Sequence, residues 1–298
     1  MIAISTAWVT RRHESAEAMF ADILAAGYTN VELNVHLTPA MVDEAEKLAR
    51  DGRINIISLH NYCPVPDGIE RMQGGGDLFL FSSEDAEVRR QAVTWTRNTI
   101  ETAARLGARL VVAHWGIVEL PGAVQRQRDA AQALRVGEQV SIDPAERAAA
   151  ARPYLDRALD SFLQVVPTAR TNGVRLGIEN RNYFHEIPSL DEIGEFLAAA
   201  PDVTGYWHDI GHAAILEWLG VVPPHAYRET WASHALAVHV HDVTGDSDHL
   251  PMGGGEVDFP AELAPFPPGI PWIVESHHGT PEEITAMRET LERLRSSR

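Results

Sequence analysis

The chain has 298 residues, of which 45% are hydrophobic and 22% are charged, an ordinary composition for a globular protein. Its 42 acidic and 25 basic residues give a net charge of −17, which disfavours broad contact with nucleic acid or an anionic membrane. Cys63 is the only cysteine, which excludes an intrachain disulfide, and we expect a cytoplasmic protein. Lys47 is the only lysine and lies on a predicted surface helix, so Schiff-base chemistry inside a barrel is excluded.

Short apolar runs alternate with longer helical patterns, which is typical of βα units around a parallel sheet. Eight such units predict an α/β protein with a single (β/α)8 TIM barrel domain over residues 1–298. The predicted strands are Ile2–Thr6, Asn30–Val35, Ile54–His60, Arg109–Trp115, Val174–Glu179, Val203–Asp209, Ala235–His241 and Pro271–Glu275. The predicted helices are Ser15–Ala26, Pro39–Arg50, Asp85–Leu106, Ala145–Asn172 and Pro281–Arg298.

Two segments between these elements exceed ordinary loop length. They are Asn61–Glu84 and Gly116–Asp143, and each follows a predicted strand. The carboxyl ends of barrel strands carry the active site, so either segment could cover it as a lid. A simple insertion at the surface explains their length equally well. Both interpretations stay open from the sequence.

Predicted strands end repeatedly in residues that bind metal ions. Glu179, Asp209 and His239 are separated by 30 residues each, roughly the length of one βα unit, so they should stand at equal heights on successive strands. Glu275 ends the last strand. Three carboxylates and one imidazole suit a divalent ion such as Mn²⁺, Zn²⁺, Co²⁺ or Mg²⁺.

Any one of these residues could be an ordinary polar side chain or an ion-pair partner. Together they would bury several charges at one point, and a cation would compensate them. The same uncertainty applies to the aromatic residues Trp8, Trp115, Trp207 and Phe259, which could wall a sugar pocket or form core. Gly253–Gly255 could cradle a phosphate or form a turn. His13, His36, His225 and His234 are interpreted as ordinary surface or helix residues.

Several motifs in order resemble the xylose isomerase-like barrel superfamily over nearly the whole chain. They are Ile178-Glu179-Asn180, Asp209-Ile210-Gly211-His212, His239-Val240-His241-Asp242, His249 to Gly255, and Val274-Glu275-Ser276. The superfamily includes sugar-phosphate isomerases, ketose 3-epimerases, inosose dehydratases and endonuclease IV. The resemblance implies that Glu179, Asp209, His239 and Glu275 bind one metal ion. It also implies that Glu179 and Glu275 act as acid and base.

The same resemblance implies substrate contact by His212, and we add Trp115 and His241 as candidates. In the endonuclease IV branch, further metal ligands match His60, His114, His212 and His249, so a second or third ion stays open. One departure from this pattern argues against a complete site for three metal ions. The aspartate that the branch carries two residues before the position of His249 is Ser247 here, between Asp246 and Asp248.

Three functions are compatible with this pattern. The first is a metal-dependent isomerase or epimerase of a sugar, a sugar phosphate or a related polyol, acting by proton transfer beside a chelated carbonyl. The second is a multinuclear hydrolase of a phosphoester, and the third is a catalytically silent barrel. Metal content would separate them, with one ion expected for the first, two or three for the second and none for the third. We expect a small-molecule partner, no membrane and no nucleic acid, and assembly into a homo-oligomer stays open.

Overall fold

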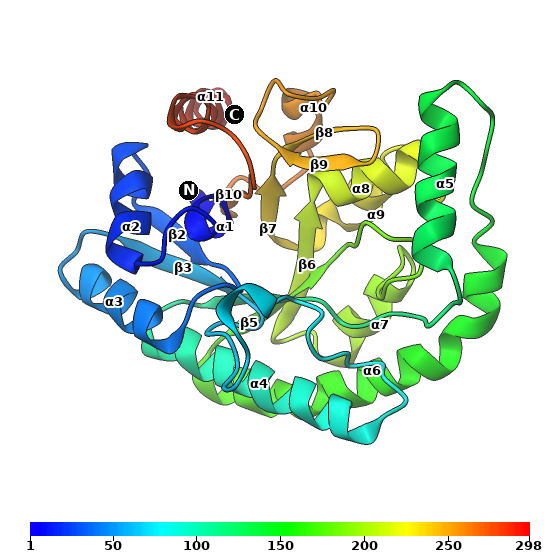
Figure 1. Ribbon diagram of the computed structural model, residues 1–298, viewed down its shortest axis with the longest axis horizontal. Coiled ribbons are helices and arrows are strands. Elements are labelled where there is room, and N and C mark those ends of the chain that lie inside the picture. The colour runs from blue at the N-terminus through cyan, green and yellow to red at the C-terminus, as the bar shows by residue number, and fades with distance from the viewer.

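In a computed structural model that describes residues 1–298, eight parallel strands close into a barrel surrounded by helices (Figure 1). The order around the barrel is β1-β10-β7-β6-β5-β4-β3-β2. The barrel strands are β1 (Ile2–Ser5), β2 (Asn30–Leu33), β3 (Asn55–His60), β4 (Leu110–Ala113), β5 (Arg175–Glu179), β6 (Thr204–Asp209), β7 (Ala235–Val240) and β10 (Trp272–Val274). Each predicted strand is present, trimmed at most by two residues at either end. The predicted (β/α)8 fold is confirmed.

The strands are apolar because both of their faces are covered. Val111, Val112 and Ala113 of β4 are fully buried, as parallel strands between a barrel interior and a helical layer must be. Inside the barrel, Trp207 and Ile273 belong to a small apolar cluster. The larger core lies between the strands and the helices. This packing leaves the polar residues at strand ends as the chemically interesting part of the barrel.

Eleven α-helices accompany the strands. They are α1 (Ala7–Thr10), α2 (Ala16–Ala25), α3 (Pro39–Arg50), α4 (Ala86–Arg105), α5 (Ala123–Arg135), α6 (Ala145–Asn172), α7 (Glu192–Ala199), α8 (Ile210–Trp218), α9 (Ala226–Trp231), α10 (Phe259–Leu263) and α11 (Pro281–Ser296). Ser15, Thr38, Asp85 and Thr280 cap the helices that follow them, since each side chain accepts a backbone N–H. The long helices α4 and α6 run side by side (Figure 1).

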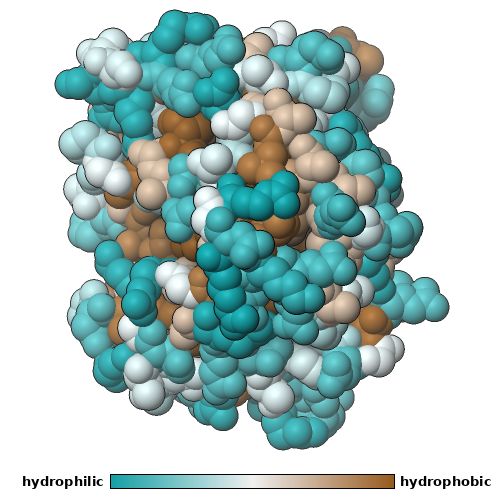
Figure 2. Space-filling model, turned by 90° about the vertical axis from the view of Figure 1, so that its left-hand side faces the viewer, coloured by the Kyte–Doolittle hydropathy of each residue, from teal (hydrophilic) through white to brown (hydrophobic).

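The two long segments have different structures. Residues 61–84 contain only a short 3₁₀ turn, Arg71–Gln73, whereas residues 116–143 contain α5. A hairpin of β8 (Asp242–Thr244) and β9 (Ser247–Leu250), which the sequence did not predict, follows β7 at the carboxyl end of the barrel. The face drawn in Figure 2 is largely hydrophilic, in keeping with the charged composition. None of the helices is both long and apolar enough to span a membrane.

Candidate metal centre and cavity

The four predicted metal ligands meet at the carboxyl ends of the barrel strands. Glu179 and Asp209 end β5 and β6, His239 lies in β7 opposite Asp209, and Glu275 follows β10. One ligand atom of each lies within 4.8 Å of the others. The oxygens nearest to Nδ1 of His239 lie at 2.8 Å (Glu275), 3.0 Å (Glu179) and 3.6 Å (Asp209). Atoms bound to one ion at about 2.0–2.2 Å stand roughly 3 Å apart, so the donor set fits a divalent cation.

The charges of this group also fit a cation. All four side chains are almost fully buried. Burial lowers the pKa of His239, but Glu275 and Glu32 outweigh it and hold that pKa well above its ordinary value. Burial raises the pKa of Glu275, and the His239 imidazole more than offsets this and lowers it. One imidazole still faces three carboxylates, and a divalent cation would neutralise the excess negative charge.

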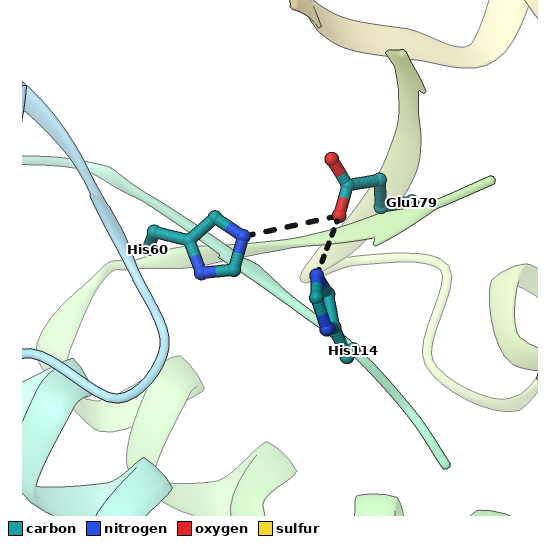
Figure 3. Close-up of side chains that lie close together, drawn as sticks. All are labelled: His60, His114 and Glu179. Carbon is teal, nitrogen blue, oxygen red and sulfur yellow. Dashed lines mark ion pairs between the residues drawn. The ribbon is translucent and has the colours of Figure 1, made fainter. Parts of the chain in front are cut away.

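A second group of ligand type joins His60 and His114 to Glu179, as Figure 3 shows. Oε2 of Glu179 lies 3.3 Å from Nε2 of His114 and 3.9 Å from Nε2 of His60. The other ring nitrogens are held by the protein. Nδ1 of His114 lies 2.9 Å from Oδ2 of Asp77, and Nδ1 of His60 lies 2.9 Å from the carbonyl oxygen of Asn61. Both imidazoles therefore present Nε2 to the same carboxylate oxygen.

A third group consists of Asp209, His212 and His249. Asp209 caps α8 by accepting the backbone N–H of His212, which fixes these two residues relative to each other. Nδ1 of His212 lies 3.0 Å from the carbonyl oxygen of Asn180, and Nδ1 of His249 lies 3.0 Å from Oδ1 of Asp248. Nε2 of each ring is left for a ligand. The predicted additional residues His60, His114, His212 and His249 thus all lie around the central four.

The departure from the endonuclease IV pattern has a structural counterpart. Ser247 is exposed on the hairpin, and Asp248 beside it contacts His249 through its carboxylate. That carboxylate therefore orients a ring of the third group. A fourth group of ligand type consists of His249, Glu275 and His277, the last stacked on His249 with ring centroids 3.9 Å apart.

A cavity of about 230 Å³ opens over this centre. Only two of its 16 lining residues are hydrophobic, so it suits a hydroxyl-rich molecule better than an apolar one. Glu179 and Glu275 reach its wall, but Asp209 and His239 do not. Its other polar residues are Thr10, Arg11, Asn34, His36, His60, His114, Arg181, Asn182, His212, His249 and His277.

Two predicted substrate contacts, Trp115 and His241, do not line this cavity. Trp115 is fully buried in an aromatic cluster with Phe162 and Phe196, away from the cavity. His241 is also buried and does not line the cavity; its Nε2 donates to Asp209 at 2.9 Å. It is placed to orient a ligand rather than to touch substrate. The remaining aromatic candidates Trp8, Trp207 and Phe259 are buried as well, as the core interpretation expects.

The glycine run forms a turn around an aspartate. The backbone N–H groups of Val243, Gly253 and Val257 all donate to the carboxylate of Asp242. A side chain at Gly255 would lie 2.2 Å from the carbonyl oxygen of Val243, so the turn requires glycine there. The alternative, a phosphate cradle, is not supported because Asp242 already occupies these donors.

Several residues of the site were not predicted from the sequence. His36 lines the cavity, contrary to its interpretation as an ordinary surface histidine. Arg181 is buried, and its guanidinium lies 3.3 Å from Oε2 of Glu179 and 2.9 Å from Oε1 of Glu186. Asp77 comes from the first long segment and holds His114. Arg181 follows Glu179 by two positions on a strand end, a signal that could have identified it.

Several solved structures share the arrangement of this barrel. Structures with the same overall fold include a D-tagatose 3-epimerase-like protein, at 19% identity, covering 98% of this chain and 96% of that chain, with a TM-score of 0.69. D-psicose 3-epimerase from Clostridium cellulolyticum H10 with D-tagatose has 13% identity, 98% coverage of both chains and a TM-score of 0.69. The TTHB071 protein from Thermus thermophilus, soaked with ZnCl₂, has 21% identity, covers 100% and 98%, and has a TM-score of 0.63.

At these identities, the likeness establishes the fold rather than the reaction. A comparison with curated protein sequences gave no match. The family pattern is more specific, because it matches residues 20–297 and so includes every strand end described above except that of β1. The chain belongs to the xylose isomerase-like TIM barrel family.

Proposed function

We propose that this protein is a divalent-metal-dependent isomerase or epimerase of a sugar, a sugar phosphate or a related polyol. One observation carries the proposal: of the four central ligands, only Glu179 and Glu275 also line the polar cavity. Their strands, β5 and β10, are separated by β6 and β7 in the barrel. Two carboxylates on separate walls can serve a proton transfer that removes a proton on one side and returns it on the other. The epimerases among the similar structures support this class of reaction.

Each carboxylate divides its oxygens between the centre and the cavity side. Oε1 of Glu179 faces His239, whereas its Oε2 faces His114 and Arg181. Oε2 of Glu275 faces His239, whereas its Oε1 accepts a hydrogen bond from Asn34 at 2.8 Å. A bound divalent ion would polarise the substrate carbonyl and acidify the adjacent C–H group. The outward oxygens of Glu179 and Glu275 would then take up and return the proton.

Replacement of Glu179 by glutamine tests this role. Glutamine keeps an oxygen near the centre but cannot accept the proton, so we expect turnover to fall by roughly 10²- to 10⁴-fold. Solvent-deuterium incorporation into a panel of ketoses and aldoses, followed by NMR, measures the proton transfer without knowledge of the natural substrate. Glu217→Gln, on α8 outside this cavity, is the matched control. Wild-type exchange rates in Glu179→Gln at unchanged metal content would rule out the base role.

A second candidate is a multinuclear phosphoester hydrolase. It is favoured by the sharing of carboxylates, since Glu179, Asp209 and Glu275 each belong to two ligand groups. Bridging carboxylates are expected where neighbouring ions act together on a phosphoester. The net charge of −17 disfavours DNA as the substrate.

The metal content of His114→Ala separates the two candidates. A single-ion epimerase should retain its one ion per chain, because His114 is outside the central four. A multinuclear hydrolase should lose about one ion per chain, together with its activity on a phosphoester panel. Elemental analysis of wild type and variant, purified in parallel, gives the count. An ion-free wild type that takes up no added metal would contradict both candidates.

A further inference from the structure

Glu32 is a buried carboxylate that belongs to none of the ligand groups and does not line the cavity. It lies in β2 and is fully buried. Its Oε1 lies 3.0 Å from Nε2 of His239, and its Oε2 accepts the hydroxyl of Ser58 in β3 at 2.7 Å. In the barrel order, β1 and β10 lie between β2 and β7, so the Glu32–His239 contact crosses the barrel interior. A carboxylate in such a place needs a reason, because burial disfavours its charge.

The reason follows from the two nitrogens of His239. Nδ1 faces Glu275, Glu179 and Asp209, whereas Nε2 faces Glu32 alone. A neutral imidazole carries one proton, so a ring that binds an ion through Nδ1 must keep its proton on Nε2. That N–H group is buried, and without an acceptor its burial would be unfavourable. Glu32 is the acceptor.

Three other imidazoles around the centre follow the same rule. His60 and His212 each direct Nδ1 to a backbone carbonyl oxygen, and His114 directs Nδ1 to Asp77. In each ring, one nitrogen is held by the protein and the other is left for a ligand. His239 differs only in that Nε2 is the held nitrogen. Its acceptor is a fully buried carboxylate fixed by a further hydrogen bond.

We infer that Glu32, held by Ser58, is a positioning residue that fixes the tautomer and orientation of His239 and strengthens it as a metal ligand. The inference rests on the central metal site of the proposed function. A carboxylate that accepts the N–H of a ligating histidine raises the basicity of the ring, and loss of such a partner typically weakens metal binding about 10- to 100-fold. Ser58 contributes by donating a hydrogen bond to the other oxygen of this carboxylate, which fixes its position.

Co²⁺ binding to metal-free protein tests the inference without any substrate. We expect Glu32→Leu, which has no acceptor, to weaken Co²⁺ binding about 100-fold. Glu32→Gln retains an acceptor oxygen without the charge, and its loss should be about tenfold. Ser58→Ala should fall between wild type and Glu32→Leu. Glu229→Gln, on α9 and outside the site, is the control.

Two further readouts separate positioning from a general structural role. The Co²⁺ absorption bands should shift in Glu32→Leu, and ¹⁵N NMR of the wild type loaded with diamagnetic Zn²⁺ should show the His239 proton on Nε2. Thermal melting shows whether each variant folds. If Glu32→Leu does not fold, the Co²⁺ affinity of Glu32→Gln tests the inference instead. Unchanged Co²⁺ affinity in Glu32→Gln and any folded Glu32→Leu, or a proton on Nδ1, would overturn this inference alone. Failure of the wild type to bind Co²⁺ would overturn the proposed metal site and this inference with it.

Discussion

The carboxylate of Glu179 has two oxygens with different partners. Oε1 lies 3.0 Å from Nδ1 of His239, and Oε2 lies 3.3 Å from both Nε2 of His114 and the guanidinium of Arg181. Burial raises the pKa of Glu179, but His114 and His239 more than offset it and lower it well below its ordinary value. The carboxylate is therefore ionised at neutral pH. The imidazoles that produce this effect are themselves sensitive to pH.

His114 predicts a pH dependence for the metal-free protein. Burial and Arg181 lower the pKa of His114, but Asp77 and Glu179 outweigh them and raise it to about 9. The pKa of histidine in the unfolded chain is about 6.5. The contacts of protonated His114 with Asp77 and Glu179 therefore stabilise the fold fully below pH 6.5, and this stabilisation is lost as the pH rises to about 9. We expect the free energy of unfolding in urea to fall across that interval, by about 1–3 kcal/mol from His114.

His114→Gln should flatten this pH dependence, because the glutamine amide does not titrate. The pKa of His249 is also raised to about 9, through Asp248, so a part of the slope should survive in the variant. His234→Gln, which changes an exposed ring outside the cavity, provides the control. Equal slopes in His114→Gln and wild type would contradict the assigned pairing.

At the scale of elements, the strand ends are the part of the site that the sequence could predict. The carboxyl ends of parallel strands meet at one edge, so Glu179, Asp209 and His239 could be brought together from their spacing, and Glu275 from its place at the end of the last strand. Glu32 could not, because two strands separate it from the strand of its partner, and only three-dimensional closure of the barrel brings them together across the interior.

Loops are harder to predict than strands for a physical reason. Asp77 reaches His114 from a segment with almost no regular structure, so no periodic pattern marks it. Trp115 is the reverse case, a residue that was predicted to contact substrate but does not line the cavity. It follows β4 by two positions, yet the aromatic residues Phe162 and Phe196 from two helices offer it an apolar contact, and it turns away from the cavity. Position in the chain predicts the site, while packing decides which side chains face it.

The contact between α6 and α7 includes a buried ion pair. Arg147 of α6 pairs with Glu192 of α7, with Nη2 at 2.6 Å from Oε2, and also donates to the backbone oxygen of Glu186. Arg147→Met leaves a buried carboxylate without its partner, and we expect a loss of about 3–5 kcal/mol in the free energy of unfolding. Urea titration measures it.

The same helix offers a matched control. Arg170 pairs with Asp202 through two hydrogen bonds, but both side chains are more than half exposed. Arg170→Met should therefore change the free energy of unfolding by only about 0–1 kcal/mol. A loss of that size in Arg147→Met would show that the buried pair does not hold α6 against α7.

At the scale of the whole molecule, the contacts that close the barrel and the ligand groups lie at opposite ends of the strands. β1 pairs with β10, and Arg295 of α11 donates to the backbone oxygen of Met1 at 2.8 Å, so both ends of the chain help to close the barrel. The ligand groups lie at the opposite, carboxyl ends of the strands. The centre therefore concentrates a part of the chain's net charge of −17 at one buried place.

Metal removal should consequently destabilise the entire fold. The central ligands come from β5, β6, β7 and the end of β10, so an ion bound there connects four neighbouring strands and also neutralises buried carboxylates. A ligand at 100 times its dissociation constant stabilises the folded state by about 2.7 kcal/mol, which corresponds to a rise of roughly 5 °C in Tm for a domain of this size. Scanning calorimetry of chelator-treated protein, with and without added Mn²⁺, Co²⁺ or Zn²⁺, measures the shift. The double variant Asp209→Asn, Glu275→Gln should lose most of it. An equal rise in that variant would place the bound metal elsewhere on the protein.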